Sequence, residues 1–253
     1  MPNYRHPHHN HIHRVLSSLK SVLFGNDEIL FGGGTLITLT NGEYRRSDDI
    51  DFVVTPRSQT YKDLRSLVRE DPAPLFDNLP DDLKLSTATC DQYGIRFAIL
   101  YKEDNQDKVI KFDIFQDARL DLEPGVEFEG IPVKSLCPRG QIVQKLFAIA
   151  DRGHSCGINH RDIYDLAVLV NAGGDLVEAI KIANQAYDVE RALTSVLNAI
   201  EDPNTRDADM DELDIANEYR PMIADGIEKI RELAGLASRI DRHHFETHKE
   251  YPL

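Results

Sequence analysis

The spacing of apolar residues predicts strands mixed with helices in the first half of the chain and helices alone in the second. In the first half, helical spacing predicts helices over about 12–24 and 61–68. Apolar runs bounded by turn residues predict the strands, which are Ile29–Phe31, Asp49–Val54, Leu83–Cys90, Ile95–Tyr101 and Val109–Phe115. Three strands in succession at the end of this set favour an antiparallel or mixed extension of the sheet.

The pattern changes after Pro138. A hairpin-like stretch at 126–133 is the last extended segment, and helical spacing then predicts only helices, over 141–151, 161–171, 176–184, 189–199 and 211–239. The last of these helices contains Pro221, which we expect to break or kink it. The chain is therefore predicted to be an α+β protein with two domains. These are a mixed sheet with flanking helices over 1–137 and a helical bundle over 138–253.

One segment, residues 29–54, combines glycines with paired carboxylates. An apolar strand enters the turn Gly32–Thr35, a short helix follows, and a second strand opens with Asp49-Ile50-Asp51. Glycines let the backbone approach a phosphate, and amides at a helix start attract negative charge. Side chains alternate along a strand, so Asp49 and Asp51 point the same way, roughly 6.6 Å apart. They are close enough to share one hard cation.

Two better-known phosphate-binding motifs do not fit this segment. A P-loop requires a lysine and then Ser or Thr directly after its last glycine, where Thr35 and Leu36 stand. A dinucleotide fingerprint requires a third small residue three positions after Gly34, where Ile37 stands. The remaining pattern suits a nucleoside triphosphate and its metal. The structural alternative is a plain glycine turn followed by an exposed acidic strand.

A third carboxylate is predicted on the strand 109–115. Ile110, Phe112 and Ile114 form one apolar face of this strand, and Lys111 and Asp113 lie on the other. An aspartate in an apolar strand is costly unless it is paired, hydrogen-bonded, bound to a metal or hydrated. We therefore place Asp113 beside the other two aspartates, the alternative being an aspartate that faces solvent next to the lysine.

Two predicted helices of the second half carry a further set of charges. Lys145 and Arg152 lie on one helix face, where two cations could reach a polyphosphate. On the next helix, Arg161 and Asp165 form an i, i+4 pair, with Asp162 on the same side as Asp165. The alternative is a salt-bridge network that ties the two helices together. We favour that alternative for the Arg161–Asp165 pair and a functional role for Lys145.

Composition and charge narrow the class of protein only in part. The chain has 253 residues, 41% of them hydrophobic and 28% charged, which is ordinary for a soluble domain. Three cysteines without CxxC spacing predict neither a disulfide framework nor a zinc site and fit the cytoplasm. No apolar run is long enough to span a membrane. The net charge of −14 disfavours a nucleic-acid surface but does not exclude one, because charges can segregate.

The N-terminal tract 5–14, RHPHHNHIHR, holds five of the ten histidines. Histidine-rich tracts can bind metal adventitiously. Because no carboxylate or cysteine accompanies these histidines, we interpret the tract as a polar lead-in to the first helix.

Two sets of motifs occur in a defined order along the chain. The first is Gly33-Gly34-Thr35 followed by Arg46-Ser47-x-Asp49-Ile50-Asp51, and the second runs from Lys145 to Arg152 and from Arg161 to Leu166. Together they resemble the AbiEii/AbiGii family of toxin nucleotidyltransferases, within the DNA polymerase β-like superfamily. The resemblance covers about 31–170. It implies a nucleotidyltransferase-like sheet, with a helical domain that completes the active-site cleft.

The resemblance also implies roles for individual residues. It assigns the metal site, for Mg²⁺ or alternatively Mn²⁺, to Asp49, Asp51 and Asp113, which form the catalytic set together with Lys145. It assigns contact with the nucleotide to Gly33, Gly34, Thr35, Arg46, Ser47, Lys145, Arg152 and Asp162. The loop between Arg152 and Arg161 is longer than the family's compact version, which makes the relative placement of Lys145 and Asp162 less definite.

The activity that the resemblance implies is Mg²⁺-dependent transfer of a nucleoside monophosphate from a triphosphate to an acceptor hydroxyl. The expected acceptor is RNA, such as a tRNA 3′ end, and the expected partner is a cognate antitoxin protein. Three alternatives stay open. They are a small-molecule nucleotidyltransferase of the antibiotic-modifying type, a non-catalytic relative that binds nucleotides or partners, and a helical interaction scaffold.

Overall fold

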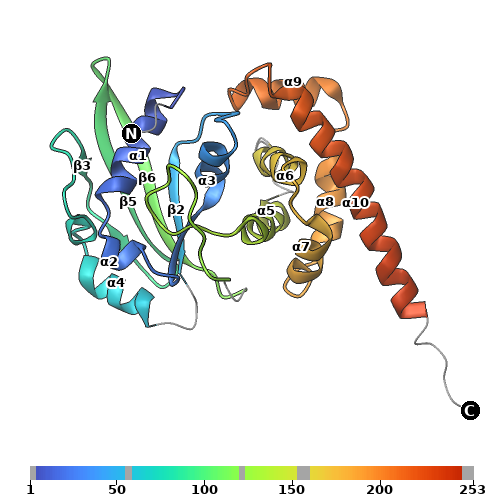
Figure 1. Ribbon diagram of the computed structural model, residues 1–253, viewed down its shortest axis with the longest axis horizontal. Helices are drawn as coiled ribbons and strands as arrows, with labels where there is room; N and C mark the ends of the chain where they lie inside the picture. The colour runs from blue at the N-terminus through green and yellow to red at the C-terminus, as the bar shows by residue number, and fades with distance from the viewer. Residues whose placement is uncertain (1–3, 55–58, 120–122, 153–159, 247–253) are drawn as a thin grey trace, which may run out of the picture. The chain divides into compact units, whose positions relative to one another are not determined.

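The computed structural model describes residues 4–54, 59–119, 123–152 and 160–246 (Figure 1). The chain divides into two compact units, Met1–Cys137 and Pro138–Leu253. Within the described residues, the first unit contains a six-stranded mixed sheet with helices, and the second is entirely helical. The predicted fold class is confirmed. That the second unit completes a cleft with the first stays a prediction.

The sheet of the first unit places β2 and β6 at its centre. Its strands are β1 (Ile29–Gly32), β2 (Asp49–Val54), β3 (Lys84–Leu85), β4 (Thr89–Cys90), β5 (Gly94–Glu103) and β6 (Gln106–Gln116). The strand order is β1-β2-β6-β5-β3, and β4 also pairs with β5. The β2–β6 pairing is parallel and the other pairings are antiparallel. Two strands that are far apart in the sequence are therefore neighbours in the middle of the sheet.

One strand prediction was too simple, because the segment 83–90 forms two short strands rather than one. The hydroxyl of Ser86 accepts a hydrogen bond from the amide of Ala98 at 2.9 Å, where a strand would offer a backbone carbonyl. Two residues further on, the amide of Ala88 donates to the carbonyl of Glu70 at 2.8 Å. These bonds interrupt the ladder with β5 and separate β3 from β4.

Helices of the first unit cover the apolar face of the sheet. They are α1 (Pro7–Ser18), α2 (Ser21–Phe24) and α4 (Thr60–Val68), together with the 3₁₀ turn Ala73–Leu75, while α3 (Gly33–Thr40) follows β1 directly. Phe52 and Phe112, on the two central strands, are fully buried and stack with 5.5 Å between ring centroids. This apolar face fixes the opposite, polar face on which the aspartates of β2 and β6 lie.

The N-terminal region differs from the prediction in two ways. The helix expected over 12–24 is broken after Ser18, because the amide of Lys20 donates to the carbonyl of Leu75 at 3.0 Å and Leu19 forms a β-bridge with Phe76. The histidine tract is not a polar lead-in but most of α1. His8, His9 and His13 are buried. A similar local difference occurs at 126–133, where Val126 bridges to Ser135 rather than closing a hairpin.

The second unit consists of α5 (Pro138–Arg152), α6 (Arg161–Asn171), α7 (Leu176–Ala183), α8 (Val189–Ala199), α9 (Pro203–Glu212) and α10 (Arg220–Glu246). The helix predicted over 211–239 is broken, as expected, and the break lies just before Pro221, since α9 ends at Glu212 and α10 begins at Arg220. Pro221 stands in the first turn of α10, where a helix needs no amide donor. Within this unit α10 packs closely on α6, since a Cβ at Gly226 would lie 2.3 Å from the carbonyl oxygen of Ala167.

Candidate active site

The glycine turn and the second aspartate of β2 are sterically interlocked. Gly32 pairs with Asp51 across the β1–β2 ladder, and Gly33 then turns the chain into α3 with φ of +70°. A Cβ at Gly33 would lie 2.1 Å from Oδ2 of Asp51. Only a residue without a side chain fits, so the backbone at the start of α3 runs directly against this carboxylate.

Thr35 and Ser47 join the glycine turn to the start of β2. The hydroxyl of Thr35 donates to the carbonyl of Asp49. A threonine hydroxyl has a single proton, so in the 2.7 Å contact between Thr35 Oγ1 and Ser47 Oγ the serine is the donor. Both side chains are buried. They hold the loop before β2 in place.

The three predicted aspartates lie on neighbouring positions of one sheet face. Asp51 is in register with Asp113 across the parallel β2–β6 ladder, and Asp49 precedes Asp51 by two residues. All three are half-buried. Burial, and then the charge of Asp49, raises the pKa of Asp113 above its usual value. The site therefore concentrates negative charge.

This donor set fits a hard divalent cation. Oδ1 of Asp49 is buried without a hydrogen-bond partner, and its ion-pair partner, Lys111 Nζ, is 3.6 Å away. A cation there would supply the missing partner and relieve the repulsion that raises the pKa of Asp113. The described part of the chain contains no closed group of three or more such ligands, so the three side chains are adjacent rather than drawn together around one point.

A buried histidine supports the same loop, and sequence reasoning missed it. The amide of Ser47 donates to Nε2 of His9 at 3.1 Å, so this nitrogen accepts and the proton lies on Nδ1. Nδ1 then donates to Oε1 of Glu43 at 2.7 Å. Burial lowers the pKa of His9, although hydrogen bonding to Glu43 opposes this effect. The helical spacing of His9 with Ile12, Leu16 and other buried positions of α1 was the available signal.

Two charged residues of the predicted set are paired locally. Arg46 is largely exposed and donates to Asp48 at 2.7 Å.

In the helical unit, Lys145 Nζ contacts Asp162 at 2.9 Å and Asp165 at 2.6 Å. The partner of Asp165 in the α5–α6 pair is thus Lys145, where we had favoured Arg161.

Arg152 completes this network with a 2.7 Å bond to Asp162. Burial alone would raise the pKa of Asp162, but Lys145 and then Arg152 hold it below the usual value. The side chain of Lys145 is only 8% exposed. Within this unit the network explains Lys145 as an internal ion pair, and its contact with nucleotide phosphates stays a prediction.

Solved structures share this fold. The chain matches JHP933 from Helicobacter pylori with a TM-score of 0.57 and 15% identity, covering 97% of this chain and 98% of that one. It also matches a protein from H. pylori described as a candidate nucleotidyltransferase, with a TM-score of 0.53 and 13% identity over 96% of this chain and 97% of the other. No curated protein matches. These two matches show that this chain has the same fold as the two H. pylori proteins.

The family model described as nucleotidyl transferase AbiEii toxin, type IV toxin–antitoxin system, matches residues 14–244. The chain therefore belongs to the AbiEii family and is a nucleotidyltransferase. The resemblance inferred from the motifs is confirmed. Among the described residues, none of the helices has the length and apolarity needed to cross a membrane.

Proposed function

We propose that this protein transfers a nucleoside monophosphate from a nucleoside triphosphate to a hydroxyl of an RNA acceptor, with a divalent metal, as the toxin of a toxin–antitoxin pair. The observation that carries the proposal is the interlocked arrangement of the Gly33 turn with Asp51, in register with Asp113. Phosphate-binding backbone and metal-binding carboxylates then meet at one place. The family description supports the antitoxin partner.

Each residue of the proposed site has a role of its own. The backbone at Gly33 and Gly34 approaches the triphosphate, while Thr35 and Ser47 keep that turn in position. Mg²⁺ bound at Asp49 and Asp51 would offset charge on the triphosphate and acidify the acceptor hydroxyl. Lys145, Arg46 and Arg152 are proposed to contact phosphates, and Asp162 to orient Lys145.

The bond changes in this reaction balance without a covalent enzyme intermediate. The acceptor oxygen forms a bond to the α-phosphorus, the bond from that phosphorus to pyrophosphate breaks, and the hydroxyl proton goes to Asp113. Asp113 is the carboxylate in register with Asp51 on the neighbouring strand, which makes it the candidate base on the acceptor side of the site.

The first test is isothermal titration of ATP, GTP, CTP and UTP with Mg²⁺ on the wild type and on Asp49→Asn/Asp51→Asn. A matched control is Asp104→Asn/Asp107→Asn, which removes the same charge from the exposed β5–β6 turn. We expect Mg²⁺-dependent binding in the wild type and control and its loss in the site variant. We expect the wild type and the control to transfer α-labelled nucleotide to RNA, and the site variant to lose this transfer.

Two results would refute the proposal. Well-folded wild type that binds none of the four triphosphates would favour the non-catalytic relative. Label transfer to a cationic small molecule but to no RNA would replace the RNA acceptor with the antibiotic-type alternative.

A further inference from the structure

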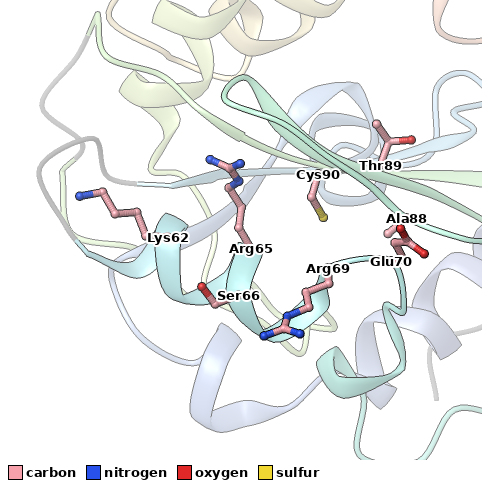
Figure 2. Close-up of a pocket in the computed structure, with 8 residues that line it drawn as sticks. All are labelled: Lys62, Arg65, Ser66, Arg69, Glu70, Ala88, Thr89 and Cys90. Carbon is pink, nitrogen blue, oxygen red and sulfur yellow. The ribbon is translucent and has the colours of Figure 1, made fainter.

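A pocket of about 670 Å³ lies between α4 and the edge of the sheet at β4 (Figure 2). Its volume is in the range of sites that take a small organic ligand or part of a larger one. Two hydrogen bonds hold α4 against this edge. They are the bond from the amide of Ala88 to Glu70, at 2.8 Å, and the bond from the hydroxyl of Tyr61 to Asp91, also 2.8 Å. These hydrogen bonds hold the two sides of the pocket in place.

The lining of the pocket is basic although the chain is acidic. Lys62, Arg65 and Arg69 come from α4 and its C-terminal cap, and Glu70 is the single acid among the lining residues. Within the part of the chain that the structure describes, none of these three cations forms a salt bridge. By contrast, Arg14, Arg46, Arg96 and Arg119 of the same unit are each bonded to an aspartate. In a chain of net charge −14, this is a local concentration of available positive charge.

Arg69 occupies a backbone position that does not favour an arginine. It caps α4 with φ of +49° and ψ of −99°, and glycine adopts a positive φ more readily than residues with a side chain. A residue with a Cβ at such a positive φ destabilises the folded state by about 1 kcal/mol or more. A long cation at such a position is consistent with a use for its side chain.

The strand register links the pocket to the carboxylates of the active site. Asp51 is in register with Asp113, Asp113 with Arg96, and Arg96 with Thr89, which lines the pocket. Residues in register on adjacent strands lie on the same face of the sheet, and adjacent strands are about 4.8 Å apart. Thr89 is thus about 10 Å from Asp113 across the sheet, with a cation, Arg96, between them.

From this arrangement we propose that the α4 pocket binds backbone phosphates of the RNA acceptor, whose reactive end lies at Asp113. This rests on the transfer to RNA proposed above. The strand would pass along the polar face from Asp113 over Arg96 and Thr89, and then round the edge of the sheet at β4 to the cations of α4.

The shape of the positive charge favours a polyanion over a single phosphate. Lys62 and Arg69 are two helical turns apart, about 10 Å along the axis. Figure 2 shows their side chains and that of Arg65 spreading from α4 in different directions rather than converging. Successive phosphates of a strand match such a distribution better than one compact anion does. Burial raises the pKa of the Cys90 thiol, which also lines the pocket, and the charge of Arg65 opposes this effect.

The test compares two triple variants with the same change of charge. Lys62→Gln/Arg65→Gln/Arg69→Gln neutralises the pocket, and Lys84→Gln/Lys102→Gln/Lys108→Gln neutralises three lysines on β3, β5 and β6. Binding of a labelled single-stranded RNA of mixed sequence is measured by fluorescence anisotropy over a series of salt concentrations, and triphosphate binding is measured by titration. All substituted side chains of the pocket are exposed, so the fold should persist.

We expect the pocket variant to lose roughly tenfold or more in RNA affinity, and its slope of log affinity against log salt to fall by about 2, for three phosphate contacts. The control variant should keep most of the affinity, and triphosphate binding should be unchanged in both. Equal losses in the two variants, or unchanged RNA affinity in the pocket variant, would overturn the proposal. A pocket variant that binds RNA as the wild type does but no longer binds an acidic protein would also overturn the proposal, because the pocket would then be a protein-binding site.

Failure of the pocket and failure of the proposed function give different results. If the wild type binds RNA through the pocket but labels no RNA from any triphosphate, the transfer proposal fails and the RNA site stands. If the pocket variant binds and labels RNA as the wild type does, the transfer proposal stands and the pocket assignment fails.

Discussion

Replacing Gly33 with alanine is the sharpest test of the interlock between the glycine turn and the carboxylates. The new Cβ would lie 2.1 Å from Oδ2 and 2.8 Å from Cγ of Asp51. Contacts this short cannot be tolerated, so either the aspartate leaves its rotamer or the start of α3 moves away from β2. Either movement separates the backbone proposed to bind phosphate from the carboxylate proposed to bind the metal.

The expected cost has two parts. A residue with a Cβ at φ of +70° costs about 1–2 kcal/mol, and forcing Asp51 off its rotamer adds about 1 kcal/mol. Gly33→Ala should therefore destabilise the protein by about 2–3 kcal/mol. Gly173→Ala is the matched control, because Gly173 has φ of +94° and no heavy atom within 4 Å of the added Cβ. It should show the backbone cost alone.

Urea unfolding measures the stability of both variants, and titration with Mg²⁺ and triphosphate measures the site. Gly33→Ala should weaken triphosphate binding roughly tenfold or more, which corresponds to about 1.4 kcal/mol, whereas Gly173→Ala should leave it unchanged. The steric reasoning is refuted if Gly33→Ala costs no more stability than the control and binds triphosphate as tightly as the wild type.

Three further predictions concern buried charges and histidines. Lys145→Met leaves two buried carboxylates without their ammonium partner and should lower the free energy of unfolding, measured in urea, by about 3–5 kcal/mol. The control Lys181→Met, whose partner Glu178 is exposed, should lower it by less than about 1 kcal/mol. Equal losses in the two variants would contradict the buried network. Burial lowers the pKa of histidines of α1 below 6.5, so the unfolded chain binds protons that the folded chain does not. Stability should therefore be full above about pH 6.5 and fall below it, and a urea midpoint that rises from pH 7.5 to 5.5 would be the opposite result. His9→Gln should weaken triphosphate binding several-fold by releasing the Ser47 amide, while His11→Gln, half-buried on the same helix, should not; identical affinities would remove His9 from the support of the loop.

The parts of the fold that were predicted are those in which local pattern and tertiary packing agree. The alternation of Asp49, Ile50, Asp51 and Phe52 placed two carboxylates on one face of β2, and the burial of these four residues follows the same alternation. The helices over Arg161–Asn171 and Val189–Ala199 begin and end where helical spacing placed them. In these segments a single periodicity decides the structure.

The parts that were missed depend on partners far away in the sequence. His9 is polar by composition, and only Glu43 and the Ser47 amide make it a buried residue. For Lys145 the sequence left a phosphate contact and a salt bridge between the helices as alternatives, and only the fold shows that Asp162 and Asp165 enclose its ammonium group. The phosphate contact stays a prediction. Lys62, Arg65 and Arg69 follow an i, i+3, i+7 spacing in the sequence, but only the fold shows that β4 lies opposite them and forms a pocket.

The parallel pairing of β2 with β6 also bears on how the enzyme is made. Asp51 lies on β2 and Asp113 on β6, and between these strands the chain must add α4, β3, β4 and β5. Pairings between such distant segments form late, because the loop must close before the contact gains anything. A ribosome that has released only the glycine turn and β2 has therefore made two of the three carboxylates but not the third. If the three carboxylates act as proposed, the nascent chain would stay without activity at least until β6 emerges and inserts between β2 and β5.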